Sequence, residues 1–331
     1  MTLSKNGETP VEKNGSGQVS VVIPTYNRAG FLCEAIDSAL AQTGVDLEVI
    51  VVDDGSTDDT ESVMSAYDDP RIRYIRQENA GAAVARNTGI FAASKPWVAL
   101  LDSDDVWLPG KLAGQFDDLA KHPDVIAHMT NVDINRPGMP KTDLVRHRRI
   151  EALFPAGKTR RFDAPLIFNV RHNFMRLQSL LVRTDVLHKI GGFDQTTTYF
   201  EDTELANRIA LEGPWLVSPE VTVREIRRDE AGIGIGTRRS KELEVGYESL
   251  SSKLVSIKER SISKEELTVV QEKIDLYAGL AAREWLRKGK VAEARAALAP
   301  ARVVRPLLRL ALMPGLGSLI RPLLRRNKPW T

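Results

Sequence analysis

The chain has one cysteine, almost no net charge and no long apolar run. Cys33 alone excludes an intrachain disulfide and a zinc site built from cysteines. The net charge of +2 excludes a strongly polyanionic or polycationic chain, and no nucleic-acid partner is expected. No apolar stretch approaches the roughly 20 residues of a membrane-spanning helix. Residues 1–18 are polar and lack the apolar centre of a signal peptide, so we interpret them as a disordered leader.

What the chain does contain is a repeated alternation of strand and helix patterns. Short β-branched runs predict buried strands, and apolar residues at helical spacing predict helices between them. Repeated β–α–β units indicate a mostly parallel sheet with helices on both faces. We expect the strands at residues 19–24, 47–52, 72–76 and 97–101, and the intervening helices within residues 29–43, 53–67 and 80–94.

Polar clusters follow the predicted strands directly. The sequences "TYNR", "DDGS" and "DSDD" each begin where a strand ends, so they should gather at one edge of the sheet, where ligands of such folds bind. The last cluster places Asp102, Asp104 and Asp105 within four positions, and such charges repel one another. A divalent cation relieves that repulsion, and Mg²⁺ or Mn²⁺ prefers carboxylate oxygens and substrate phosphates. On its own, this cluster would favour a solvated acidic loop, but the preceding strand and the other polar clusters favour the metal site.

Several motifs, in order along the chain, resemble those of glycosyltransferase family 2, whose members transfer a sugar with inversion of its anomeric configuration. The resemblance covers roughly residues 19–230 and implies an α/β fold of the GT-A, nucleotide-diphospho-sugar transferase-like type. In that fold the sheet is mixed and mostly parallel, with the nucleotide on the N-terminal side and the acceptor on the C-terminal side. The motifs are "VSVVIPTYNRAGFLCEAIDSALAQT", "VIVVDDGSTDDT", "NAGAAVARNTGI", "VALLDSDDVWLP" and "LVRTDVLHKIGGFDQTTTYFEDTELANRIA".

The domain organisation follows from this resemblance and from the composition of the remainder. We predict a leader at 1–18, a catalytic domain at 19–235, a helical extension at 236–300 and a basic amphipathic tail at 301–331. The catalytic domain divides into a nucleotide-sugar half, 19–110, and an acceptor half, 111–235. A basic insert at 136–176 covers the active site, grips an anionic acceptor or is a solvated loop, and these alternatives stay open.

The resemblance assigns most of the predicted site to the nucleotide sugar. Tyr26 is placed to pack against the base, and Asp54 to accept a hydrogen bond from the imide N–H of uracil or thymine. Asp54 and Asp53 also suit N-capping near Ser56. Arg86 is assigned to phosphate contact or to orienting the aspartate loop. The predicted nucleotide-sugar-binding residues are Pro24, Thr25, Tyr26, Arg28, Asp54, Arg86, Asp102 and Ser103.

The same resemblance implies a metal and a catalytic base. Asp104 is the predicted ligand of Mn²⁺ or Mg²⁺. Asp229 stands where many relatives have a histidine, and is predicted as a second ligand. Alternatively, Arg227 and Arg228 bind the diphosphate directly, or this loop is a plain surface turn.

The acceptor hydroxyl must lose its proton as it attacks the anomeric carbon, which calls for a carboxylate base. Asp202 in "FEDTEL" is the predicted base. N-capping of the helix that follows is the competing interpretation.

The functional prediction is an inverting transfer of a sugar from a nucleotide-diphospho-sugar to an acceptor hydroxyl. A UDP-sugar is the favoured donor, and a glycan or lipid-linked glycan of a surface polysaccharide or glycoconjugate is the expected acceptor. The alternative is a non-catalytic nucleotide-sugar-binding or scaffold protein. A dinucleotide-binding oxidoreductase is disfavoured because the first strand–helix turn, "PTYNRAG", lacks the G-x-G-x-x-G pattern.

The C-terminal third carries the remaining predictions. The helical extension either packs on the catalytic domain or forms the seam of a homo-oligomer. The tail, 301–331, combines leucine pairs with basic residues and has no acidic ones, a pattern that suits an anionic membrane surface. Docking of the tail on the protein is the alternative. We therefore predict a cytoplasmic protein that is peripheral at the inner face of the cell membrane.

Overall fold

The computed structural model describes residues 17–135, 141–197, 199–226, 243–260 and 262–302. The chain divides into two compact units. The sheet unit comprises residues 1–163, 174–193 and 212–227, and the helical unit comprises 164–173, 194–211 and 228–331. Each unit thus collects stretches that are far apart in the sequence. Asp229, nearly all of the predicted leader and nearly all of the tail lie outside the described residues.

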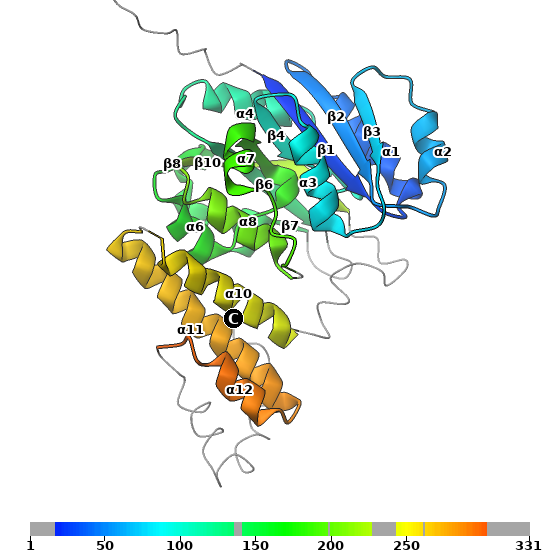
Figure 1. Cartoon of the computed structure of the whole chain (residues 1–331). Coiled ribbons are helices and arrows are strands. Elements are labelled where there is room, and N and C mark those ends of the chain that lie inside the picture. Colours follow the sequence, from blue (N-terminus) through cyan, green and yellow to red (C-terminus); the bar gives the residue numbers. More distant parts are fainter. Residues whose placement is uncertain (1–16, 136–140, 198, 227–242, 261, 303–331) are drawn as a thin grey trace, which may run out of the picture. The chain divides into compact units, whose positions relative to one another are not determined.

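A large mixed sheet forms the centre of the sheet unit (Figure 1). Its main path runs in the order β3-β2-β1-β4-β9-β6-β10-β5, with β7 paired to β6 and β8 paired to β10. The strands are β1 (Gln18–Thr25), β2 (Asp46–Asp53), β3 (Ile72–Arg76), β4 (Trp97–Leu100), β5 (Asp105–Trp107), β6 (Ala127–Asn135), β7 (Thr142–Asp143), β8 (Arg160–Phe162), β9 (Leu180–Arg183) and β10 (Trp215–Ile226).

The four strands predicted from β-branched runs are confirmed, and β3 has the bounds expected from the sequence. They pair in parallel, with Val21 opposite Val49 and Val22 opposite Leu100. Beyond β4 the sheet becomes mixed, as the predicted fold class implies. There β9 runs antiparallel to β4 and to β6, whereas β6 and β10 pair in parallel.

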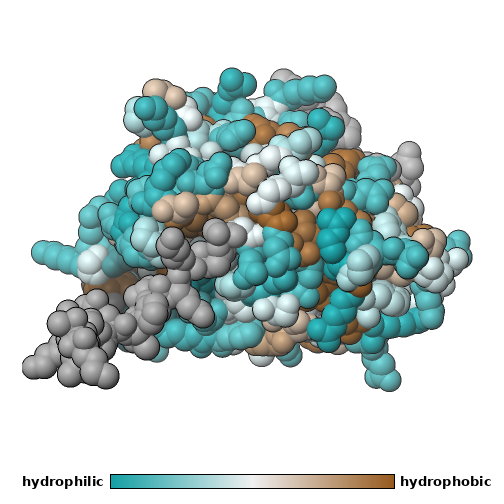
Figure 2. All heavy atoms as spheres, turned by 90° about the horizontal axis from the view of Figure 1, so that it is seen from above, coloured by the Kyte–Doolittle hydropathy of each residue, from teal (hydrophilic) through white to brown (hydrophobic). Residues whose placement is uncertain are grey.

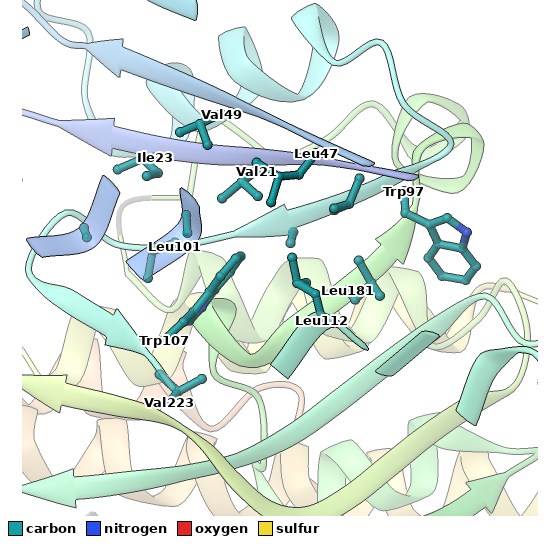
Figure 3. Packing of buried hydrophobic residues seen from close by; sticks show 14 of the residues in the cluster. Val21, Ile23, Leu47, Val49, Trp97, Leu101, Trp107, Leu112, Leu181 and Val223 are labelled. Atoms are coloured by element: carbon teal, nitrogen blue, oxygen red, sulfur yellow. The ribbon is translucent and has the colours of Figure 1, made fainter. Parts of the chain in front are cut away.

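Helices cover both faces of the parallel part of the sheet. One face packs against α1 (Ala29–Leu40) and α4 (Lys111–Leu119), and Leu32 of α1 belongs to the same buried cluster as Val21 and Trp97 of the strands. Figure 3 shows Leu112 of α4 within this cluster. The opposite face packs against α3 through Ile50, among others. The helices of this unit are α1 (Ala29–Leu40), α2 (Thr60–Ser65), α3 (Ala82–Ala92), α4 (Lys111–Leu119), α5 (Leu144–His147) and α7 (Thr184–Ile190).

Two glycines are required where backbone segments approach closely. Gly55, in the turn after β2, has φ +78°, and a Cβ there would lie 2.9 Å from the backbone nitrogen of Asn79. Gly89 lets α3 approach β1, because its Cβ would lie 2.2 Å from Cγ1 of Val22. Both contacts draw a helix or loop toward the carboxyl ends of the first strands.

The helical unit contains α6 (Pro165–His172), α8 (Glu201–Ile209), α10 (Leu243–Lys258), α11 (Lys264–Arg287) and α12 (Val291–Ala297). The predicted helical C-terminal extension is therefore confirmed. Ser263 and Glu266 form a reciprocal capping box that fixes the start of α11. Small residues such as Ala281 and Ala294 let α11 and α12 pack closely, and Trp285 packs against them.

The surface is ordinary for a folded protein. Figure 2 shows a face on which hydrophilic side chains predominate and hydrophobic ones gather in patches between them. Within the described ranges, no helix combines the length and the apolar character needed to cross a membrane.

Candidate active site

The loops after β1 and β2 are joined by hydrogen bonds at the carboxyl edge of the sheet. The N–H of Asp54 donates to the carbonyl of Thr25 at 2.9 Å. Asn27 has φ +51°, a left-handed conformation that asparagine tolerates, and its N–H donates to Oγ of Ser56 at 2.9 Å. In return, Oδ1 of Asn27 accepts from the N–H of Thr57 at 2.7 Å. The two polar clusters "TYNR" and "DDGS" are therefore one rigid structure.

Asp54, the residue predicted to bind the nucleobase, is 3% exposed and forms hydrogen bonds with the loop after β3. Its Oδ1 accepts from Nε2 of Gln77 at 2.8 Å and from the N–H of Ala80 at 2.9 Å, and its Oδ2 accepts from the N–H of Gly81 at 2.8 Å. A carboxylate offers about four acceptor positions. Oδ2 thus keeps capacity for one more donor, such as an imide N–H. Sequence reasoning missed Gln77, although it lies in a polar stretch that directly follows a strand.

Asp53 has a different task from its neighbour. It is fully buried, its Oδ1 accepts from the N–H of Ser56 at 2.8 Å, and its Oδ2 accepts from the hydroxyl of Tyr74 at 2.6 Å. Asp53 therefore closes the turn after β2. The expected helix N-capping by this pair is wrong, because α2 begins at Thr60 with Asp59 as its N-cap residue. Asp54 is the member of the pair that faces the loop.

The other predicted nucleotide contacts from β1 lie beside this structure. Tyr26 is 47% exposed, so one face of its ring is accessible for stacking. Oγ1 of Thr25 is buried and, among the described residues, has no hydrogen-bond partner. Pro24 and Arg28 flank them and are partly buried, with Arg28 at the start of α1. An exposed ring next to an unsatisfied hydroxyl suits a polar aromatic ligand.

The "ARN" sequence of α3 connects the acidic loop to the "GGFD" turn. Nη2 of Arg86 donates to Oδ1 of Asp102 at 2.8 Å, and its guanidinium lies 5.4 Å from the ring centre of Phe193. Asn87 exchanges two hydrogen bonds with the backbone of Phe193, donating at 2.9 Å and accepting at 2.7 Å. Of the two roles expected for Arg86, its hydrogen bond to Asp102 corresponds to orienting the aspartate loop.

The three acids of the "DSDD" loop are in different environments. The side chain of Asp102 is 31% exposed. Asp104 is partly exposed, whereas Ser103 and Asp105 are buried. Burial, followed by the charges of Asp102, Asp104 and Glu225, raises the pKa of Asp105 well above its usual range. Only Asp102 and Asp104 remain accessible to a ligand from solvent.

A buried polar network that sequence reasoning missed supports Asp105. Nε2 of Gln178 donates to Oδ2 of Asp105 at 2.7 Å and lies 3.4 Å from Oε1 of Glu225. Nε of Arg176 pairs with the same Glu225 oxygen at 2.9 Å, and the N–H of Ile226 donates to Oδ1 of Asp105 at 3.0 Å. The signal available in the sequence was an arginine and a glutamine inside the otherwise apolar run "FMRLQSLL".

The donor set at this edge fits a divalent ion bound mainly through a substrate. Asp104, the predicted ligand in this part of the chain, offers a partly exposed carboxylate, and Mg²⁺ commonly binds one or two carboxylates together with substrate phosphates. In the described part of the chain, no group of three or more His, Cys, Asp or Glu side chains is arranged to hold a metal by itself. The second predicted ligand, Asp229, lies outside that part.

The predicted base, Asp202, belongs to the helical unit and lies in the first turn of α8. Helix α8 begins at Glu201, with Phe200 as its N-cap residue, so Asp202 is not the capping residue. Its Oδ1 accepts from the N–H of Thr203 at 2.7 Å, and the side chain remains partly exposed. Glu204, another acid of this turn, is buried in a two-pronged ion pair with Arg208. The carboxylate of Asp202 is therefore more accessible to a ligand than that of Glu204.

The large mixed sheet, with acidic side chains beyond its strands, forms an α/β fold of the GT-A type. Residues 20–183 match the family model for glycosyl transferase family 2, and the chain belongs to that family. An uncharacterized glycosyltransferase of Rickettsia prowazekii is 35% identical over 193 residues, which cover 56% of this chain and 57% of that protein. The succinoglycan biosynthesis protein ExoO of Rhizobium meliloti is 34% identical over 206 residues, covering 61% and 58%. The chain spans less than two thirds of the length of these two curated relatives.

Solved structures share the fold over nearly the whole chain. TarS 1–349 of Staphylococcus aureus, in complex with UDP-GlcNAc, matches with a TM-score of 0.67 at 19% identity, covering 93% of this chain and 86% of that one. The mannosyltransferase PcManGT of Pyrobaculum calidifontis, in complex with GDP-Man and Mn²⁺, matches with a TM-score of 0.58 at 22% identity, covering 95% and 86%. At these identities the likeness shows the fold alone.

Proposed function

We propose that the protein transfers a sugar from a nucleotide-diphospho-sugar, with UDP as the favoured nucleotide, to an acceptor hydroxyl with inversion. The observation that carries this proposal is the carboxyl edge of the parallel strands, where Asp54 bonds to Thr25 and Arg86 pairs with Asp102, in a member of glycosyl transferase family 2. Donor complexes of two proteins with this fold, TarS with UDP-GlcNAc and PcManGT with GDP-Man, support a nucleotide-sugar donor.

In the proposed arrangement the base stacks on Tyr26, and its imide N–H donates to Oδ2 of Asp54. Asp102 and Ser103 face the ribose, while Arg86 keeps Asp102 in place. The loop then presents Asp104 toward the diphosphate.

Asp104, with Asp229 as the second proposed ligand, would hold the Mn²⁺ or Mg²⁺ ion. Such an ion stabilises the negative charge of the departing nucleoside diphosphate as a Lewis acid. The Mn²⁺ in the PcManGT complex supports this assignment.

Asp202 is the proposed general base. Its carboxylate accepts the proton of the acceptor hydroxyl as the oxygen attacks the anomeric carbon from the side opposite the diphosphate, which inverts that carbon. The partly exposed, ionisable side chain of Asp202 and the occupied ion pair of Glu204 support this choice.

The proposed acceptor is a glycan or lipid-linked glycan in the synthesis of a surface polysaccharide or glycoconjugate. The succinoglycan biosynthesis protein ExoO supports a polysaccharide pathway. A cytoplasmic location and peripheral membrane contact through residues 301–331 remain predictions from the sequence, as does homo-oligomer formation.

The test is nucleoside diphosphate release from a panel of UDP-, GDP- and dTDP-sugars, with and without Mn²⁺. We expect release from a small subset of the donors, dependent on Mn²⁺ and faster with a glycan acceptor. Saturable binding of a nucleotide sugar without release from any donor would identify a non-catalytic binding protein and contradict the proposal.

A further inference from the structure

The residues that precede α8 are fastened to α10 through an ion pair. The carboxylate of Asp194, in the "GGFD" sequence, pairs with the ammonium group of Lys253. The same carboxylate accepts from the N–H of Thr196 at 2.9 Å and from its hydroxyl at 2.6 Å. Partial burial acts to raise the pKa of Asp194, but the hydrogen bonds from Lys253 and Thr196 together hold that pKa well below its usual range. The ion pair is therefore formed between two charged groups at neutral pH.

A second contact with α10 holds the residue just before α8. The ring of Phe200 stacks on Tyr247 with centroids 6.4 Å apart, and Tyr247 stacks on Tyr277 of α11 at 6.0 Å. Gly246 provides the space for the ring, because a Cβ there would lie 2.7 Å from Cε2 of Phe200 and 3.6 Å from Cβ of Tyr199. The Phe200 ring thus packs against a surface of α10 that only glycine leaves open.

The position of Phe200 determines where α8 begins. Its backbone is left-handed, with φ 60° and ψ 34°, a conformation that non-glycine residues rarely adopt and that needs support from surrounding structure. Its carbonyl accepts the first helical hydrogen bond, from the N–H of Glu204 at 3.0 Å. Asp202 lies within that first turn. A change in the Phe200 backbone would therefore shift the Asp202 carboxylate directly.

We propose that α10 of the C-terminal extension positions Asp202 for catalysis, through the Lys253–Asp194 ion pair and the packing of Phe200 on Gly246 and Tyr247. This inference rests on the proposed function, in which Asp202 is the base. Lys253, Gly246 and Tyr247 are positioning residues that touch neither substrate. Helix α10 lies outside the part of the chain that matches the family model, residues 20–183. The extension accordingly belongs to the catalytic machinery.

The first test compares two glycine-to-alanine variants. Gly246→Ala places a methyl group against the Phe200 ring, whereas Gly279→Ala on α11 has no atom within 4 Å of its new Cβ. Both changes favour helix formation equally. With UDP-GlcNAc as the first donor probe and water as acceptor, we expect Gly246→Ala to lower kcat by roughly tenfold to hundredfold. The dissociation constant of UDP with Mn²⁺ should stay within about twofold, because the donor residues are untouched.

The second test removes the ion pair and then restores it. Lys253→Gln should lower kcat in the same manner, and Lys253→Arg should recover most of the lost rate, because it keeps the positive charge near Asp194. A purely structural contact would lower the melting temperature of Lys253→Gln and leave kcat of the folded protein unchanged. This second pair of variants keeps the inference open to refutation if Gly246→Ala does not fold.

The outcomes separate this inference from the proposed function. If the wild-type protein turns over donor and a folded Gly246→Ala or Lys253→Gln variant has the same kcat, the positioning role alone is overturned. Unreduced turnover in Asp202→Asn overturns the base assignment and the inference with it. No release from any donor by the wild-type protein overturns the proposed function and this inference together.

Discussion

Asp54 and Asp202 are both predicted site carboxylates, yet different kinds of structure hold them. Asp54 follows a central strand, and backbone N–H groups of neighbouring loops bind it directly. Asp202 lies in the first turn of a helix whose start depends on side chains of another helix, Tyr247 and Lys253. The comparison teaches that Asp54 is held directly by backbone N–H groups and the Gln77 amide, whereas the start of α8 is held by ring packing and an ion pair with another helix. Substitutions should therefore disturb the two regions differently.

The largest effect on ligand binding is expected from a strand-edge side chain that is proposed to bind the metal. Asp104→Ala should abolish the Mn²⁺-dependent part of nucleoside diphosphate binding, because it removes the accessible carboxylate proposed as the ligand. Isothermal titration with UDP, with and without Mn²⁺, measures this. Asp117→Ala, which removes an exposed acid from α4, is the matched control. Metal-dependent binding that survives in a folded Asp104→Ala protein would move the ligand elsewhere.

Next in size is the corresponding change in the helical unit. Asp202→Asn preserves size and hydrogen bonding to Thr203, but removes the proton acceptor, so transfer should fall on the order of a hundredfold or more while UDP binding persists. Initial rates of UDP release with saturating donor give the answer. Glu272→Gln, at an exposed position of α11, should leave the rate unchanged. A rate within about twofold of wild type would direct attention to Glu201.

A smaller effect concerns the stability of the sheet unit. Asn87→Ala leaves the N–H and the carbonyl of Phe193 without the partners they have in the wild-type protein. Because both groups are buried by the turn, the free energy of unfolding should fall by about 2–3 kcal/mol. Urea denaturation followed by circular dichroism would show this as a lower midpoint with an unchanged slope. A midpoint equal to that of the wild type would mean that water replaces the amide at no cost.

The smallest effect concerns a buried cation in the sheet unit. Lys111 is 1% exposed, donates to Oε1 of Gln115 at 2.8 Å and lies over the ring of Trp107 at 4.2 Å. Burial lowers its pKa from 10.5 to about 7. Between these two pH values the unfolded chain binds more protons than the folded one, so the free energy of unfolding rises with pH. Below about pH 7 Lys111 is protonated in both states, and the cost of burying its charge is fully present.

Lys111→Met should remove this dependence. From about pH 7.5 to about pH 9.5, the wild-type protein should gain about 2 kcal/mol of unfolding free energy relative to the variant. Urea denaturation of both proteins at the two pH values measures the difference. Parallel pH dependence in the two proteins would show that Lys111 remains charged when buried.

Much of the strand edge could be predicted because its information is local. The run "IRYIR" predicts β3 with its observed bounds, and Asp54 and Asp102 are found at strand ends because the carboxyl ends of parallel strands meet at one edge. The β-branched runs, the turn glycine and the acids all lie within short windows. Residues in such windows determine these elements with little help from the rest of the chain.

The remainder could not be predicted because its partners are distant. Asp105 is bound by Gln178, 73 residues away, and by the backbone of Ile226, 121 residues away. No periodic pattern of apolar residues in the sequence predicts these contacts, which form only when β9 and β10 join the sheet. The same holds for Phe200, whose left-handed backbone depends on Gly246 and Tyr247. The sequence identifies the acids but not the packing that orients them.

The place of β10 in the sheet sets an order of events during synthesis. β10 lies between β6 and β5, so β5 has no strand to pair with on the main path until residues up to Glu225 exist. Ribosomes add about 5–20 residues per second, so the acidic loop waits roughly 6–24 s for the partner 121 residues downstream. The pairing of β1 with β2 can form in that interval. A nascent chain would thus acquire the proposed nucleotide-binding edge before the partner of its acidic loop exists.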